Sequence, residues 1–149
     1  MAYLGSMSLL IDYFSAPDDT TAAQALTSPD ERSMIIEGRR IEPTVSLAVL
    51  EGLLGGRQFE EILDDDQSYA TVAISDTAEA FVIRLGERFE DLLLANDQSH
   101  LEATAPYWAT AEEMEGARPA DLVEFLTELQ GLVTRSRDAG EHVYCLMGL

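Results

Sequence analysis

The chain has 149 residues, of which 28 are acidic and nine are basic, giving a formal net charge of −19 at pH 7. All nine basic residues are arginines, because the sequence contains no lysine. Nucleic acids and anionic membrane surfaces both attract clustered basic side chains, so this charge argues against either partner. The missing lysine also excludes a Schiff base and a P-loop.

Hydrophobic residues make up 46% of the chain, enough to form the core of one domain of ordinary size. No apolar run approaches the roughly 20 residues that cross a bilayer, and the start lacks the features of a signal peptide. We therefore expect a cytoplasmic protein. A GC-rich genome, which uses few lysine codons, is the favoured explanation for the lack of lysine, and adaptation to high salt is the rival.

Residues 1–6 end in Gly-Ser before Met7, which is typical of a cloning junction before a natural start. We set these six residues aside and expect one domain over residues 7–149. No period of 20 to 50 residues repeats within it.

The first predicted element is an apolar and aromatic strand over residues 8–14. Ser15 is then expected to cap a short helix, with Pro17 in its first turn and its end near Leu26. After a break, residues 33–37 form a second short apolar strand.

Residues 43–54 predict a helix with one broad apolar face, which ends at the glycine pair of residues 55–56. Residues 58–63 add one or two helical turns. Asp64-Asp65-Asp66 follows and carries oxygens suited to a hard cation. The spacing lacks the glycine and glutamate of an EF-hand, so a solvated loop is favoured.

Two β-branched strands are expected next, at residues 71–74 and 80–85. Residues 78–94 also fit one long helix. We favour a strand followed by a helix from Gly86, because a new apolar stripe begins there.

Residues 101–108 predict a helix capped by Ser99 and made irregular by Pro106. Residues 119–138 give the clearest helical pattern in the chain, with acids in the first turn and arginines in the last. Residues 142–147 form a strand that is apolar on both faces and is therefore expected inside the sheet.

Strands at both ends with helices between them predict an α+β fold in a single domain. We expect a small mixed sheet that includes the N- and C-terminal strands and is packed by several helices. The two end strands are the most apolar strand candidates, and their backbone groups need partners.

No motif for a nucleophile, a metal or a cofactor is present, so we predict no catalytic residue, no metal site and no cofactor. His100 and His142 are far apart in the sequence. His142 and Cys145 are expected on opposite faces of one strand, which makes a shared metal unfavourable. Cys145 lies in an apolar strand and is predicted to be a buried core residue.

Arg39 and Arg40 form the only adjacent pair of basic residues and lie between a strand and a helix. Such a pair is suited to gripping a carboxylate or a phosphate. The favoured alternative is that each arginine pairs with one of the many acids.

Tyr107 and Trp108 precede an acidic stretch that contains Glu112, Glu113 and Glu115. An exposed tryptophan rimmed by acids is suited to a protein interface. The favoured alternative is a tryptophan packed against the C-terminal helix.

The sequence resembles the YfbM-like family of small bacterial proteins in three short segments. These are Leu10-Ile11-Asp12-Tyr13-Phe14 before a helix, Arg40-Ile41-Glu42-Pro43 leading into residues 50–56, and Gly140-Glu141-His142 before the last strand. The resemblance implies an α+β bacterial domain and carries no activity or site residues with it.

Two classes of function follow. The first is a non-enzymatic interaction domain, like an immunity protein or antitoxin, that binds a basic protein partner by charge complementarity. The second is a small enzyme or ligand-binding domain whose site is assembled from scattered carboxylates and arginines.

We predict that the protein does not bind nucleic acid, because the electrostatic interaction with phosphates is repulsive. Gel shifts at low salt, where any attraction is greatest, should show no complex with DNA or RNA. A shift that weakens steeply as salt is added would contradict this.

Overall fold

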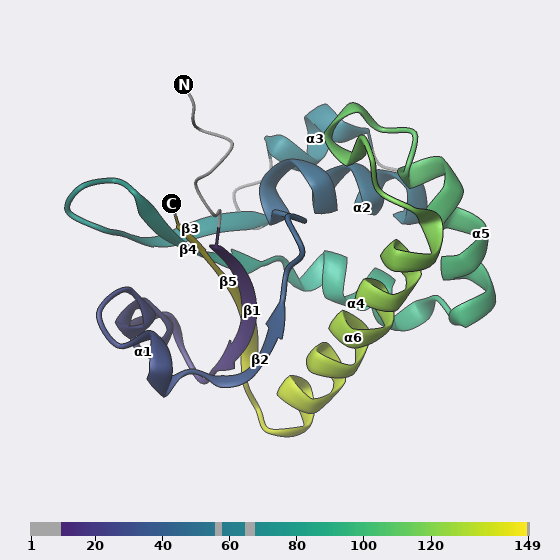
Figure 1. Cartoon of the computed structure of the whole chain (residues 1–149). Coiled ribbons are helices and arrows are strands. Elements are labelled where there is room, and N and C mark those ends of the chain that lie inside the picture. The colour runs from purple at the N-terminus through teal and green to yellow at the C-terminus, as the bar shows by residue number, and fades with distance from the viewer. Residues whose placement is uncertain (1–9, 56–57, 65–67, 149) are drawn as a thin grey trace.

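Five strands lie side by side in one sheet in the order β2-β1-β5-β4-β3 (Figure 1). The computed structural model describes residues 10–55, 58–64 and 68–148. In this part of the chain the strands are β1 (Leu10–Ala16), β2 (Ser33–Glu37), β3 (Tyr69–Ile74), β4 (Ala80–Leu85) and β5 (His142–Gly148). The α-helices are α1 (Asp19–Ala23), α2 (Ala48–Gly55), α3 (Phe59–Leu63), α4 (Glu87–Ala95), α5 (Gln98–Trp108) and α6 (Pro119–Asp138).

The N- and C-terminal strands pair directly with each other at the centre of the sheet. Their register runs from Leu10 opposite Gly148 to Ala16 opposite His142. This confirms both the predicted α+β class and the placement of the two end strands in one sheet. The segment 8–9 of the first predicted strand lies outside the described residues.

The sheet is antiparallel throughout, whereas we expected a mixed sheet. A tight turn over residues 75–79 joins β3 to β4 and allows only antiparallel pairing. The longer connections also bring the chain back with its direction reversed relative to its neighbour. Turn lengths and hydrophobic patterns do not reveal how a helical connection crosses the sheet.

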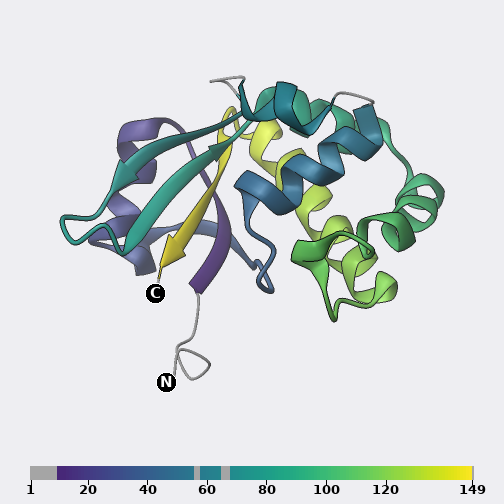
Figure 2. The ribbon, with the colours of Figure 1, turned by 90° about the horizontal axis from the view of Figure 1, so that it is seen from above.

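The two faces of the sheet carry different layers (Figure 2). Helices α2, α4, α5 and α6 cover one face, and the short α1 lies against the other. Successive side chains of a strand point to opposite faces of the sheet, so each strand contributes residues to both layers. Tyr13 and Cys145 join the large core under the helices, whereas Phe14 and Tyr144 join the small core beneath α1. None of the described helices is long and apolar enough to span a membrane.

Ser15 remains in β1 and does not cap α1, which corrects our expectation. Its hydroxyl lies 2.8 Å from that of Ser136 on α6 and donates to Glu141 at 2.6 Å. The pairing of β1 with β5 extends through Ala16, so the strand continues past the predicted end. Asp18 caps α1 instead and accepts a hydrogen bond from the amide of Thr21.

Helix α5 also begins earlier than predicted. Asp97, not Ser99, is its N-cap and accepts a 2.9 Å hydrogen bond from the amide of His100. The helix continues through Pro106 and ends at Trp108, so the expected irregularity is absent. Pro106 lies close to the end of the helix, where its missing N–H removes only one hydrogen bond from the ladder.

The helix predicted over residues 43–54 is present and begins as a π-helical turn, Pro43–Leu47, that leads into α2. The Glu42 carboxylate accepts hydrogen bonds from three amides of this turn, those of Thr44, Val45 and Ser46. The helix predicted over residues 119–138 is confirmed as α6. The separate strand and helix predicted after residue 80 are confirmed as β4 and α4.

Cys145 is fully buried in β5, as predicted, and burial raises the pKa of its thiol. His142 lies on the other face of the strand, with its Nδ1 3.3 Å from a guanidinium nitrogen of Arg84. These positions confirm that the histidine and the cysteine do not converge.

We expect Cys145 to react slowly with a thiol reagent in native protein, because the buried thiol resists ionisation and the thiolate is the reactive form. Unfolding in denaturant should make the reaction fast. The measurement is the absorbance change of a chromogenic disulfide reagent over time. Rapid labelling of the native protein would show that the core around β5 opens readily.

Candidate functional site

The segment 38–41, here called the arginine turn, joins β2 to the helical layer. The Gly38 amide donates to the Ile11 carbonyl at 2.7 Å, and the Ile41 amide donates to the Gly38 carbonyl at 2.8 Å. Arg39 and Arg40 occupy the two central positions with φ of 51° and 69°. Positive φ at both positions is typical of a type I′ turn, which favours Asn and Gly. Each arginine therefore adopts a backbone conformation that costs about 1–3 kcal/mol.

The core under the helices holds this turn in place. A Cβ atom on Gly38 would stand 2.6 Å from the Ile11 carbonyl oxygen, so the turn lies tightly against β1. Ile41 is buried, and its carbonyl accepts a 2.5 Å hydrogen bond from the Tyr13 hydroxyl. Contacts on both sides of the two arginines therefore fix the strained backbone between them.

The two arginines have different surroundings. Arg39 reaches α6, where its guanidinium lies 2.8 Å from Glu124 and 3.2 Å from Glu128. The hydrogen bond to Glu124 raises the pKa of Arg39 above its ordinary value. The side chain of Arg40 is exposed and makes no ion pair or hydrogen bond within the described residues. The favoured prediction that each arginine pairs with an acid is confirmed for Arg39 and wrong for Arg40.

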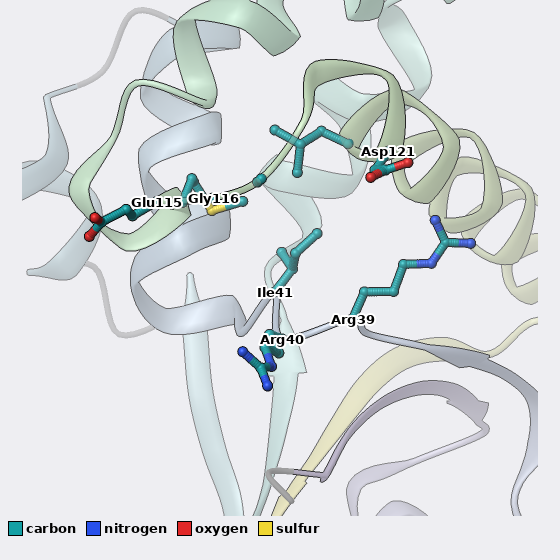
Figure 3. A pocket seen from close by; sticks show the side chains of 9 residues that line it. Arg39, Arg40, Ile41, Glu115, Gly116 and Asp121 are labelled. Carbon is teal, nitrogen blue, oxygen red and sulfur yellow. The ribbon is translucent and has the colours of Figure 1, made fainter. Parts of the chain in front are cut away.

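A hollow of about 520 Å³ opens between the arginine turn, the segment after α5 and the first turn of α6 (Figure 3). Its lining residues are Arg39, Arg40, Ile41, Met114, Glu115, Gly116, Ala117, Asp121 and Leu122. Figure 3 shows Arg39 extended toward α6, whereas Arg40 turns away from that helix. The structure thus joins the predicted arginine pair to the predicted acidic stretch, although more than 70 residues separate them in the sequence.

The floor and the rim of the hollow differ in character. Ile41, Met114 and Leu122 are buried apolar residues that line it from three segments. Arg40, Glu115 and Asp121 bring charge to it, and Asp121 is paired with Arg118 at 3.0 Å. A surface of this kind can bind a group that is apolar at one end and charged at the other.

Trp108 is fully buried, which agrees with the favoured alternative of a packed tryptophan and makes the candidate role of an exposed tryptophan at an interface wrong. Its indole N–H donates a 2.9 Å hydrogen bond to the Ser46 carbonyl in the π-helical turn. A tryptophan can be buried in this way when its N–H finds an acceptor. The neighbouring Tyr107 points outward with 70% of its surface exposed, because successive helical residues lie about 100° apart.

The acidic stretch turns back on itself immediately after α5. Hydrogen bonds from Thr110 to Tyr107, from Met114 to Ala111 and from Glu115 to Glu112 keep the chain compact. Glu112 and Glu115 are exposed, and the side chain of Glu113 lies outside the described part. We call residues 112–115 the acidic turn; it follows the exposed Tyr107 by five residues in the chain.

The other candidate residues do not contribute to the hollow. His100 is exposed at the start of α5 and lies 3.2 Å from Asp97. Asp64 ends α3, whereas Asp65 and Asp66 lie outside the described residues. Among the described side chains, no group of three or more histidines, cysteines or acids is arranged to hold a metal ion.

Sequence reasoning missed the apolar floor and the start of α6 as parts of one site. The positive φ of Arg39 and Arg40 could not be predicted from the sequence, because turns with this backbone conformation usually contain Asn or Gly at these positions. Gly38 directly before Arg39 is the one signal that pointed to a constrained turn.

Comparison with known proteins found no match to a family model, to a curated protein or to a solved structure. The resemblance to the YfbM-like family stays a prediction from the sequence.

We predict that Gly38→Ala destabilises the protein by about 1–3 kcal/mol, because the new methyl group collides with the backbone of Ile11. Gly131→Ala in α6 is the matched control. There a Cβ meets only the flexible end of Arg135, and alanine should stabilise the helix by about 0.5–1 kcal/mol. Urea unfolding measures both changes, and equal effects would contradict the packing that we assign to Gly38.

Proposed function

We propose that this protein is a non-catalytic interaction domain that binds a basic protein partner, in the manner of an immunity protein or an antitoxin. The observation that carries the proposal is the exposed Tyr107, which comes shortly before the acidic turn in the chain. A tyrosine exposed to this extent offers a large contact surface with little loss of side-chain entropy on binding.

The charges of the described residues support a basic partner. Ion pairs occupy Arg32, Arg39, Arg84, Arg118 and Arg137. Exposed acids nevertheless remain on β2, α1, α3, α4, α5 and α6, so the molecule has a strong negative field. Such a field accelerates encounter with a basic protein and opposes acidic competitors.

Local geometry favours one docking region within this field. Glu112 and Glu115 follow Tyr107 by five and eight residues, are exposed, and have no ion pair in the described structure. An aromatic anchor with acids around it matches a basic surface that carries apolar side chains. We therefore assign the interface to Tyr107 and the acidic turn.

A small enzyme or a ligand-binding domain is the second candidate. The hollow with its unpaired Arg40 favours ligand binding over catalysis. No described nucleophile stands beside a general base at the hollow.

The test begins with a partner that the protein captures from a native host extract at low salt and releases at high salt. We expect the purified pair to associate quickly at low ionic strength and markedly more slowly at physiological salt, because ions screen the field over about 10 Å at 0.1 M. Stopped-flow or surface-based kinetics measure the on-rate. An on-rate that does not change with salt would show that the charge serves solubility alone.

Two sets of variants locate the interface. Tyr107→Ala should weaken the complex by about 2 kcal/mol, whereas the exposed but distant Ile74→Ala should leave it unchanged. Glu112→Gln with Glu115→Gln should slow association more than Asp76→Asn with Glu79→Gln, a pair that removes the same charge from the β3–β4 turn. Equal slowing by both pairs would assign the effect to the overall field and refute the acidic turn as the interface.

A further inference from the structure

We propose that the hollow is a binding site for an organic carboxylate with a short apolar body, and that Arg40 is the counter-ion of the carboxylate. This site goes beyond the proposed protein interface and does not depend on it. Three observations carry the inference: an unpaired arginine on a strained turn, an apolar floor, and the start of a long helix at the same place.

The first observation is the contrast between the two arginines of the turn. Both have positive φ, and Arg39 forms ion pairs with Glu124 and Glu128. Arg40 has the same kind of strain and forms no ion pair or hydrogen bond within the described residues. In so acidic a chain, an arginine that costs stability and pairs with none of the described acids is available for a ligand. Its guanidinium suits a carboxylate, which it can bind through two parallel hydrogen bonds.

The second observation is the floor. Ile41, Met114 and Leu122 have almost no exposed surface, yet their edges line a hollow of about 520 Å³. This volume is in the range of small-molecule sites. An apolar floor beside one cation suits a ligand whose hydrocarbon part can leave water while its charged end stays at the rim.

The third observation is the start of α6. This helix has 20 residues, and its N-cap, Arg118, provides no side-chain hydrogen bond to the first turn. Leu122 and Asp121 from that first turn line the hollow. The positive end of the helix dipole therefore adds to the attraction for an anion inside the hollow.

The overall charge restricts the anion to a single negative charge. A net charge of −19 opposes any anion in proportion to its own charge, and Glu115 and Asp121 stand at the rim. A phosphate dianion would meet twice the repulsion without using the apolar floor. Two sources supply the favoured chemistry: a free short-chain carboxylic acid, or the C-terminal carboxylate of a peptide that ends in an apolar residue.

The test uses hexanoate as the probe, with hexanol and hexylamine as its neutral and cationic counterparts. Calorimetry or NMR titration of the full chain should show saturable binding of hexanoate and much weaker binding of the other two. Equal affinity for hexanol, or tighter binding of hexylamine, would overturn the proposal.

Substitutions test whether Arg40 binds the carboxylate of hexanoate. Arg40→Gln should weaken hexanoate binding by at least about tenfold, as expected when a charge-assisted hydrogen bond is lost. Arg88→Gln on α4 is the matched control, because Arg88 is also exposed and makes no ion pair among the described residues. Unchanged binding by Arg40→Gln, or an equal loss in Arg88→Gln, would refute the role of Arg40.

Arg40→Gly separates the ligand role from a structural one. Glycine relieves the positive φ, so the melting temperature should rise by about 2–4 °C while hexanoate binding is lost. A lower melting temperature would mean that Arg40 stabilises the fold and would overturn the argument from strain.

A second titration distinguishes the two sources. A short peptide that ends in leucine with a free carboxylate is compared with the same peptide bearing a C-terminal amide. Tighter binding of the free peptide than of hexanoate assigns the site to a protein C-terminus. Binding of hexanoate alone assigns it to a free acid, and binding of neither probe refutes the site.

Discussion

The pairing of β1 with β5 is the interaction on which the rest of the structure depends. These strands come from opposite ends of the chain, and each carries apolar side chains on both faces. One face supports the large core under α2, α4, α5 and α6, and the other supports the small core beneath α1. Neither core can close before the last strand has entered the centre of the sheet. The chain therefore folds through contacts between residues that are far apart in sequence, which slows folding relative to a helical bundle of similar size.

The candidate site follows from this central pair. The Ile11 carbonyl and the Tyr13 hydroxyl of β1 hold the two ends of the arginine turn. Helix α6 packs on the same sheet and supplies the glutamates that hold Arg39. The hollow lies where the arginine turn, α6 and the acidic turn meet. Its geometry is consequently fixed by the core, although its mouth is on the surface.

The hollow and the interface that we assign to Tyr107 share one segment. Glu115 belongs to the acidic turn and also lines the hollow. A basic protein that docks on the acidic turn would therefore cover or adjoin the mouth of the hollow. If its chain ended nearby in an apolar residue, one partner could engage both surfaces, with basic side chains on the acidic turn and its terminal carboxylate on Arg40.

The sequence by itself determined the α+β class, the central position of the last strand, the extent of α6 and the burial of Cys145. Each of these features follows from the spacing of apolar residues within a short segment, which indicates both the type of element and the side that is buried.

The sequence also identified Arg39, Arg40 and Tyr107 as candidate site residues. It could not show that Arg39 is paired and Arg40 is not, because 28 acids make any local pairing plausible. Only the tertiary structure decided that Trp108 turns into the core toward Ser46, that the sheet is antiparallel throughout, and that the arginine turn faces the acidic turn. These outcomes depend on which distant segments the β1–β5 pair brings together, and the local sequence of a segment does not specify its distant neighbours.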